Sequence, residues 1–274
     1  MDINVNTIPK QLSAWDRVMI ARHFERPKAS DYIPLLFEGF IELHGDRCFR
    51  DDEALIGGIA YFEHTAVTVL AQNKGKNLDE NLRTNFGMMQ PEGYRKAMRL
   101  AKQAEKFNRP IVTLVDTPGA YPGKGAEERG QASAIAECLK LFASIKVPVI
   151  AIVLSEGGSG GALAFSVANR IIMLENAVYS ILSPEGFASI LYKDESKAIE
   201  AAEIMKITSF DLHQVGFVDE IIKEPHGGAQ HDLPQVVNSL IQAIKINLDE
   251  LIKKKPDVLI KERMLKYRSI GTIE

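Results

Sequence analysis

Cysteine is scarce in this sequence. The 274 residues contain two, Cys48 and Cys138, far apart and without a CxxC pair or a Cys/His cluster. This scarcity argues against a disulfide framework and a structural zinc site, and it predicts a reducing compartment. No apolar run approaches the roughly 20 residues of a membrane helix, and the opening MDINVNTIPKQ lacks the apolar region of a secretory signal. We therefore expect a soluble, cytoplasmic protein.

The charge balance is also unremarkable. A net charge of -3 gives no general attraction to nucleic acid or to an anionic membrane, so neither is an expected partner. With 46% apolar and 25% charged residues, the composition is that of a globular protein. No linker or low-complexity tract divides the chain, which favours one α/β domain.

The first third of the sequence mixes helical and strand patterns. Ser30 can cap a helix that carries apolar residues from Ile33 to Leu43 and ends near Gly45. Two strands and a longer helix are predicted next: Leu55–Phe62 and Ala66–Ala71, joined by a turn at Glu63 and His64, and then Glu92–Asn108 behind Pro91.

Two short apolar runs in the centre end in glycine-rich loops. IVTLV follows Pro110 and leads into DTPGAYPG (116–123), and VIAIVL follows Pro148 and leads into SEGGSGGA (155–162). Both runs are typical of buried parallel strands, and a helix over Gln131–Ser144 separates them. Such a strand–helix–strand crossover brings both loops to the carboxyl edge of the sheet, where open α/β folds bind ligands.

The pattern continues as a mixed α/β fold. The elements predicted after the second loop are a helix over Ala162–Ala168, strands over Ile171–Leu174, Val178–Leu182 and Phe217–Ile222, helices near Pro184–Leu191 and Lys197–Met205, and a charged helical end that includes Lys253–Lys255.

The second glycine loop is suited to an anion. Glycines between a strand and a helix expose the first N–H groups of the helix, which lack intrahelical acceptors and lie at the positive end of its dipole. Gly161 is followed by Ala162 and Leu163, so the loop is not a P-loop, and G-x-G-x-x-G is missing. A backbone oxyanion hole is therefore one interpretation.

Two other interpretations stay open at this point. Ser159 lies in a G-x-S-x-G pattern between a strand and a helix, and Asp219 with His226 or His231 follows in the order of a hydrolase triad. The glycines also serve close packing of a helix on a sheet in many proteins, although a second glycine loop on the neighbouring crossover makes this the weaker reading.

Several long segments resemble one family. EGGSGGALA (156–164), VDTPGAYPGKGAEERGQ (115–131), NFGMMQPEGYRKAMRL (85–100), SPEGFASIL (183–191) and GDRCFRDD (45–52) are similar to the carboxyltransferase alpha-subunit family of the multi-subunit acetyl-CoA carboxylase of bacteria. The resemblance runs in register from about Trp15 to Ile222. It implies a crotonase-like fold of repeated β-β-α units with peripheral helices. Residues 1–45 would form an N-terminal helical segment, 46–225 the crotonase-like core and 226–274 a helical tail of one carboxyltransferase domain.

The resemblance also implies a reaction. The carboxyl group of carboxybiotin, presented by a biotin carboxyl carrier protein, would pass to acetyl-CoA to give malonyl-CoA, the first committed step of fatty acid synthesis. Gly160 and Gly161 would supply backbone N–H donors to the ureido oxygen of biotin. Gly157, Gly158, Gly119 and Ala120 would border the substrates, although a tight turn after Pro118 is an equal alternative for the last two.

Partners follow from the same resemblance. A beta subunit would complete the site in an alpha2–beta2 heterotetramer, bind most of acetyl-CoA and carry the family's zinc, and biotin carboxylase would join the larger complex. No covalently bound cofactor is expected in this chain. Two departures from the family stand out. The family often has a helical arm ahead of the segment that matches SAWDRV (13–18), whereas this chain begins close to that segment. Ser155 replaces a glycine that is common in the family.

Surface charges carry weaker expectations. Arg95, Arg99, Lys102 and Lys106 form a basic helix face that could meet CoA phosphates or the carrier, with Lys74 and Lys76 near in sequence. The acidic and basic trio Glu127, Glu128 and Arg129 could order its loop or meet a partner. Solvation is the commoner role of both groups.

Overall fold

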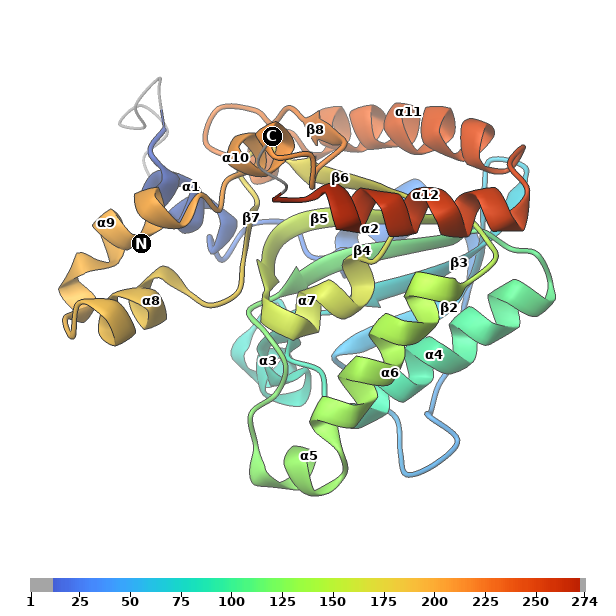
Figure 1. Ribbon diagram of the computed structural model, residues 1–274, viewed down its shortest axis with the longest axis horizontal. Coiled ribbons are helices and arrows are strands. Elements are labelled where there is room, and N and C mark those ends of the chain that lie inside the picture. Colours follow the sequence, from blue (N-terminus) through green and yellow to red (C-terminus); the bar gives the residue numbers. More distant parts are fainter. Residues whose placement is uncertain (1–11, 272–274) are drawn as a thin grey trace.

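A mixed sheet of eight strands organises the computed structural model, which describes residues 12–271 (Figure 1). The strand order is β1-β2-β3-β4-β5-β6-β8, and β7 pairs with β5 beside this path. The strands are β1 Glu38–Glu42, β2 Leu55–Phe62, β3 Thr65–Gln72, β4 Ile111–Thr117, β5 Val149–Gly158, β6 Arg170–Leu174, β7 Val178–Ser180 and β8 Glu220–Ile222.

The predicted strands of the core are confirmed. β2 and β3 form an antiparallel hairpin with Phe62 opposite Thr65, and β3, β4, β5, β6 and β8 run parallel to one another. Every residue of β4 is buried, as expected for a strand covered on both faces. The carboxyl ends of β3, β4 and β5 therefore share one edge, which is where the candidate site lies.

Helices cover both faces of the sheet. On one face α4 and α7 pack on the sheet and α6 packs on both of these helices, and on the other face α2 and α11 pack on the sheet and on each other, as Figure 1 shows. The helices are α1 Ala14–Ala21, α2 Ala29–Leu36, α3 Leu78–Arg83, α4 Pro91–Lys106, α5 Lys124–Glu128, α6 Gln131–Ser144, α7 Ser159–Ser166, α8 Pro184–Leu191, α9 Ala198–Met205, α10 Ser209–Gln214, α11 Leu233–Leu251 and α12 Pro256–Ser269.

Strand β5 is longer than the sequence predicts. Its first half pairs with β6, and its last residues, Glu156–Gly158, instead pair with β7. A predicted loop is thus the end of a strand, because the β7 backbone satisfies the N–H and C=O groups of the glycines. The strand carries the first half of the glycine motif rigidly to the start of α7.

One predicted helix is wrong in its second half. The helix begins at Ala29, with Lys28 at its N-cap, and ends at Leu36, whereas Glu38–Glu42 forms edge strand β1 against β2. Alternation in this strand is weak, and the apolar run from Ile33 onward is compatible with a helix. The backbone pairing with Tyr61, Ile59 and Gly58 decides the outcome, and sequence periodicity does not report such non-local pairing.

The predicted N-terminal segment and tail extend beyond the described residues. Residues 1–11 and 272–274 lie outside them. Within the tail, α11 packs against α2 and α12 against α6, and Lys253–Lys255 falls in the connection between α11 and α12, not within a helix. In the described range no helix is long and apolar enough to cross a membrane.

A buried arginine ties the tail to the body. Arg263 of α12 donates hydrogen bonds to the carbonyls of Phe142, Ile145 and Val147, where α6 ends and β5 begins. It caps carbonyl groups that have no partner within α6. The tail is therefore part of the packed core, not an appendage.

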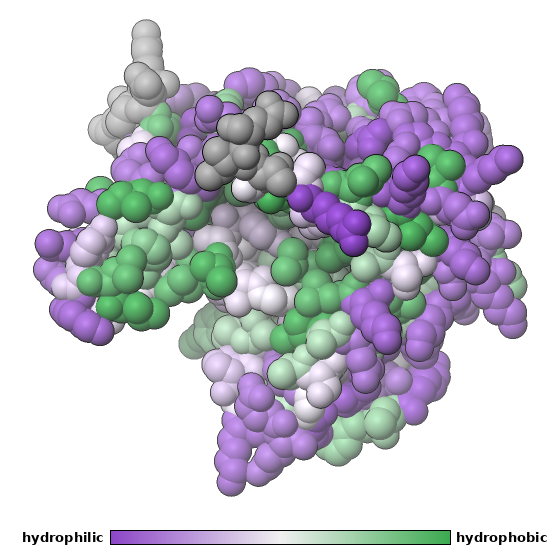
Figure 2. Space-filling model, viewed as in Figure 1, coloured by the Kyte–Doolittle hydropathy of each residue, from purple (hydrophilic) through white to green (hydrophobic). Residues whose placement is uncertain are grey.

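Helices α8 and α9 project from the body as an arm (Figure 1). They pack on each other, and α9 contacts α1. Large apolar side chains on the arm are exposed: Ile190 61%, Leu191 60%, Ile199 55% and Ile204 58%. Figure 2 shows the resulting apolar surface over this arm. Such an extended apolar surface is typical of a protein–protein interface.

Candidate active site

The two glycine loops meet at the carboxyl edge of the sheet, as the sequence predicts. Thr117 at the end of β4 lies opposite Gly157 in β5. A Cβ placed on Gly161 would lie 2.7 Å from the carbonyl carbon of Gly119 and 2.8 Å from the nitrogen of Ala120. Only glycine at position 161 permits this approach, so the loops form one structural unit.

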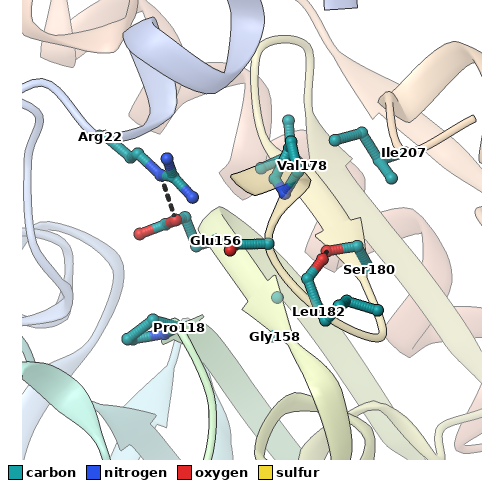
Figure 3. Close-up of a pocket in the computed structure, with 11 residues that line it drawn as sticks. Arg22, Pro118, Glu156, Gly158, Val178, Ser180, Leu182 and Ile207 are labelled. Carbon is teal, nitrogen blue, oxygen red and sulfur yellow. Dashed lines mark hydrogen bonds and ion pairs between the residues drawn. The ribbon is translucent and has the colours of Figure 1, made fainter. Parts of the chain in front are cut away.

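A second close approach joins the loops on the strand side. A Cβ placed on Gly158 would lie 2.1 Å from the carbonyl oxygen of Pro118. Gly157 is covered by a side chain, because the ring of Tyr179 in β7 would lie 2.1 Å from its Cβ. Gly157 and Gly158 are largely buried, yet both line the hollow shown in Figure 3, so their role beside a substrate stays a prediction.

Side-chain hydrogen bonds fix both loops. The Thr117 hydroxyl donates to the carbonyl of Gly119 at 2.7 Å and accepts from the N–H of Gly119 at 3.1 Å. The Gln72 side chain donates to the carbonyl of Gly161 at 2.8 Å and accepts from the N–H of Asp116 at 3.2 Å. All of these groups are buried, where a hydrogen bond restricts motion most.

Two N–H groups at the start of α7 remain available. Gly160 and Gly161 are the second and third residues of the helix, where N–H groups have no intrahelical acceptor. Among the described residues neither N–H donates a hydrogen bond. Gly160 is partly exposed, and a Cβ there would meet only Ile135 Cγ2, at 3.4 Å. The helix therefore offers two donors and its positive dipole end at the rim of the loops.

An ion-pair network lies below the loops. Glu156 accepts from Arg22 Nε at 2.7 Å (Figure 3) and from Lys74 Nζ at 2.8 Å. Arg22 also pairs with Glu185 at the start of α8. Lys74 also pairs with Asp116 at 2.8 Å. The network connects the end of β5 to the arm.

The network holds its charges firmly. Burial alone would raise the pKa of Glu156, but the neighbouring Lys74 and Arg22 lower that pKa to about 2. Burial disfavours the charged form of Lys74, yet Asp116 and Glu156 raise its pKa above the ordinary value. Neither group is therefore poised as an acid or a base near neutral pH. Their role is to fix the end of β5.

Ser155, one of the two departures from the resembled family, has a defined contact. Its hydroxyl accepts a hydrogen bond at 3.0 Å from Arg26, which also donates to the carbonyl of Leu154 at 2.6 Å. Arg26 is buried and pairs with Glu224. The substitution thus adds a partner to a buried cation and leaves the glycine donors unchanged.

The aspartate of the serine-hydrolase alternative lies far from the nucleophile position. Asp219 accepts from the N–H of Ile171, which is opposite Ala151 in β5. Strand β5 ends at Gly158, seven residues after Ala151, and Ser159 comes next. At 3.3 Å per residue, roughly 20 Å of strand separates Ala151 from Ser159. Asp219 is therefore near the opposite edge of the sheet from Ser159.

The histidines are no better placed. His226 and His231 are exposed, and their loop packs on α1, since a Cβ on Gly228 would lie 2.9 Å from Ile20. In residues 12–271 neither histidine is hydrogen-bonded to Ser159. Ser159 does have the left-handed φ of 54° that a strand-to-helix turn imposes, but no base is assembled beside it.

Three of the other charged candidates, Arg95, Arg99 and Arg129, have structural partners. Arg129 pairs with Glu92 at 2.8 Å and so orders its loop against α4. Arg95 pairs with Glu92 and Asp46, and Arg99 donates to main-chain carbonyls. The sequence analysis missed Gln72, Arg22 and Glu156. Gln72 and Glu156 end parallel strands, which is a usable signal, whereas Arg22 is far from the motif in sequence.

The sheet topology and the helices on its two faces define a crotonase-like α/β fold, and solved structures share it. The transcarboxylase 12S core, with methylmalonyl-coenzyme A and methylmalonic acid bound, matches with a TM-score of 0.66 at 18% identity, over 88% of this chain and 46% of that chain. The chain thus spans about half of that protein. The Pseudomonas malonate decarboxylase hetero-tetramer matches at 0.62 and 17%, over 77% of this chain and 84% of that one.

Sequence relatives are more specific. The family model described as acetyl co-enzyme A carboxylase carboxyltransferase-like matches residues 2–271. Acetyl-coenzyme A carboxylase carboxyl transferase subunit alpha of Staphylococcus haemolyticus is 58% identical over 95% of this chain and 82% of its own length, and that of Clostridium acetobutylicum is 55% identical over 96% of both. This chain belongs to the carboxyltransferase alpha-subunit family of acetyl-CoA carboxylase, and the predicted family and fold class are confirmed.

Proposed function

We propose that this chain contributes the biotin side of a shared carboxyltransferase site, which moves the carboxyl group of carboxybiotin to acetyl-CoA. The observation that carries the proposal is the contact of Gly161 with Gly119 and Ala120, which leaves the N–H groups of Gly160 and Gly161 as free donors at the start of α7. Both half-reactions place negative charge on an oxygen, the ureido oxygen of biotin or the enolate oxygen of the thioester.

Fixed donors suit this chemistry. One preorganised N–H group in a comparable hole is worth about 2.7–4 kcal/mol of transition-state stabilisation. The rigid loops supply the preorganisation, because buried Gln72 and Thr117 hold the backbone on both sides. Gly160 is partly exposed and Gly161 is buried, so the N–H of Gly160 would meet the ligand first.

No side-chain base is required in this proposal. Transfer of the carboxyl group leaves the ureido nitrogen of biotin with an electron pair, and that nitrogen takes the proton from the methyl carbon of acetyl-CoA as the new carbon–carbon bond forms. The low pKa of Glu156 and the absence of a histidine beside Ser159 within the described range are compatible with this division of labour.

We propose the arm as the docking surface for the beta subunit. Ile190, Leu191, Ile199 and Ile204 expose apolar area on α8 and α9, and Arg22 and Glu185 link the base of the arm to the glycine loops. Docking there would bring the second subunit to the open side of the site. The same assembly would include the biotin carboxyl carrier protein and biotin carboxylase. The beta subunit would bind most of the acyl-CoA and would also carry the zinc. The assembly would act in the cytoplasm.

The test is carboxyl transfer from malonyl-CoA to a soluble biotin derivative. We expect no activity from this chain alone and full activity with the co-expressed beta subunit. Ile199→Asp should abolish co-purification of the subunits and activity together, whereas Lys140→Gln, on the exposed face of α6, should change neither. A folded, bound pair without transfer activity would overturn the proposal.

A further inference from the structure

The hollow shown in Figure 3 lies beside the glycine loops and is lined by Gly157 and Gly158. A second hollow adjoins it and has a basic lining. Residues 21–28, which connect α1 and α2, form one wall, and residues 74–86, which include α3, form the other. Pro118 and Glu156 also line it, and both line the hollow beside the loops in Figure 3. A ligand could therefore extend from one hollow into the other without leaving the protein surface.

Four cationic side chains line this hollow, and three of them have protein partners. Lys74 pairs with Asp116 and Glu156, Arg22 pairs with Glu156 and Glu185, and Lys76 pairs with Asp31 at 2.5 Å. The fourth is Lys28.

Lys28 is the exception because its ammonium has no hydrogen-bond or ion-pair partner among residues 12–271. Only 9% of the residue is exposed, so the charge is largely removed from water. Burial lowers the pKa of Lys28, and Lys74 and Arg26 nearby lower it further, while Asp116 raises it. A buried cation without a partner is costly, and an anionic ligand would supply the missing partner.

Aromatic rings flank the lysines. Phe24 is 62% exposed and Phe86 is 45% exposed, and both line the hollow. Phe86 and the preceding Asn85 both have left-handed backbone, with φ of 56° and 48°. Two consecutive left-handed residues thus hold a large apolar ring at the wall of the hollow, where a base could stack on it.

We infer that this hollow binds the 3′-phosphorylated adenosine diphosphate portion of the acyl-CoA, with Lys28 and Lys76 on phosphate oxygens and Phe24 or Phe86 against the base. The inference rests on the proposed function, and it gives this chain a direct share of a substrate otherwise bound by the beta subunit. A phosphate would supply the partner that Lys28 lacks, Lys76 would add its charge beside its ion pair with Asp31, and aromatic side chains offer stacking faces to any base. A ligand with only a carboxylate could pair with Lys28 but would not stack on Phe24 or Phe86.

The decisive comparison uses two substrates that share the carboxyl group and differ in the nucleotide. Malonyl-CoA carries the nucleotide and malonyl-pantetheine lacks it. In the complex with the beta subunit, Lys28→Gln should raise the KM for malonyl-CoA about tenfold, as expected for one charged hydrogen bond, and leave kcat nearly unchanged. The KM for malonyl-pantetheine should stay within twofold of wild type.

A second variant guards against misfolding. Phe24→Ala alters an exposed side chain and should raise only the KM for malonyl-CoA, about threefold or more. Lys140→Gln, an exposed lysine on α6, is the charge-matched control and should change neither KM. Calorimetric binding of adenosine 3′,5′-bisphosphate to the complex should weaken in Lys28→Gln.

The outcomes separate the two proposals. Equal rises in KM for both substrates would identify the anion as the carboxylate and overturn the inference, and unchanged KM values in both variants would overturn it as well. A wild-type complex without any transfer activity would refute the proposed function instead. In that case the binding of adenosine 3′,5′-bisphosphate, and its loss in Lys28→Gln, still decides whether the hollow is a nucleotide site.

Discussion

The side-chain amide of Gln72 donates a hydrogen bond of 2.8 Å to the carbonyl of Gly161. Its oxygen accepts from the N–H of Asp116, so one buried side chain at the end of β3 joins the end of β4 to the first turn of α7. Three parallel strands thereby fix the height and tilt of the helix whose first N–H groups we place in the oxyanion hole. Preorganisation of this kind is what allows a backbone donor to stabilise charge in the transition state.

Replacement of Gln72 by leucine should therefore reduce kcat about tenfold, because a loss of about 1–1.5 kcal/mol of transition-state stabilisation slows the reaction about tenfold. The KM values for malonyl-CoA and for the biotin derivative should stay nearly unchanged. The measurement is steady-state transfer from malonyl-CoA to a soluble biotin derivative, with the beta subunit present.

Thr113→Val is the matched control for this change. Thr113 also donates a buried hydrogen bond to α7, to the carbonyl of Phe165 at 2.7 Å, but at the far end of the helix. Loss of this hydrogen bond should lower the free energy of unfolding by about 1–3 kcal/mol, as the loss of Gln72 should, but without slowing transfer. Equal rate losses in the two variants would mean that Gln72 acts through stability alone.

The two glycines of the hole should respond differently to alanine. A Cβ at position 161 would lie 2.7–3.0 Å from the backbone of Gly119 and Ala120, whereas at position 160 it meets only Ile135 at 3.4 Å. Gly161→Ala must push the loops apart, and we expect kcat to fall about 100-fold or more, the range for a lost oxyanion donor. Gly160→Ala keeps its N–H and should remain within about threefold of wild type.

This pair provides its own control, since the chemical change is the same in adjacent residues. Circular dichroism and co-purification with the beta subunit establish that both variants fold and assemble. Similar losses in both variants, or none in either, would show that the contact of Gly161 with Gly119 does not position the donors.

The sequence predicted this region well because its signals are local. Each run of apolar residues before a glycine loop forms a buried parallel strand, and the crossover rule places both loops at one edge, so the meeting of Gly119 with Gly161 could be anticipated. The sequence predicts that the two loops are neighbours, but it does not predict which of their backbone atoms are in contact.

Failures of the prediction share a different cause. Edge strand Glu38–Glu42 and the β7 pairing of Glu156–Gly158 depend on partners distant in sequence. Arg22 reaches Glu156 across 134 positions, and Gln72 reaches Gly161 across 89. Such contacts are set by tertiary packing, which overrides local propensity and leaves no trace in a single sequence.

Ser159 offers a test that separates the two chemistries of the loop. As a serine with φ of 54° it has left-handed strain that glycine would relieve. In a backbone oxyanion hole, Ser159→Gly and Ser159→Ala should both retain transfer activity within a few-fold, and the glycine variant should be at least as stable as the alanine variant. A nucleophilic serine would instead lose activity in both.

Labelling provides the independent readout for Ser159. An organophosphate should leave the mass of the wild-type chain unchanged, both alone and with the beta subunit. Covalent modification at Ser159, together with loss of activity, would return the serine-hydrolase interpretation.

Glu156 makes stability depend on pH in a defined direction. Its pKa is about 2 in the folded protein and 4.5 as the reference value, so the unfolded state binds protons more readily. The stabilisation is complete above pH 4.5 and is lost as the pH falls toward 2, and a shift of this size corresponds to roughly 3 kcal/mol. Glu156→Gln leaves Lys74 and Arg22 without that charge and should be less stable than wild type by about 3 kcal/mol at pH 7.

The check is urea unfolding of both proteins at pH 7, 5, 4 and 3. The difference in unfolding free energy between wild type and Glu156→Gln should be constant from pH 7 to 5 and then shrink as the wild-type carboxylate takes up its proton. Glu137→Gln, which alters an exposed carboxylate on α6, should show almost no difference from wild type at each pH. A Glu156→Gln difference that stays constant down to pH 3 would mean that the residue contributes by packing and hydrogen bonding, not by its charge.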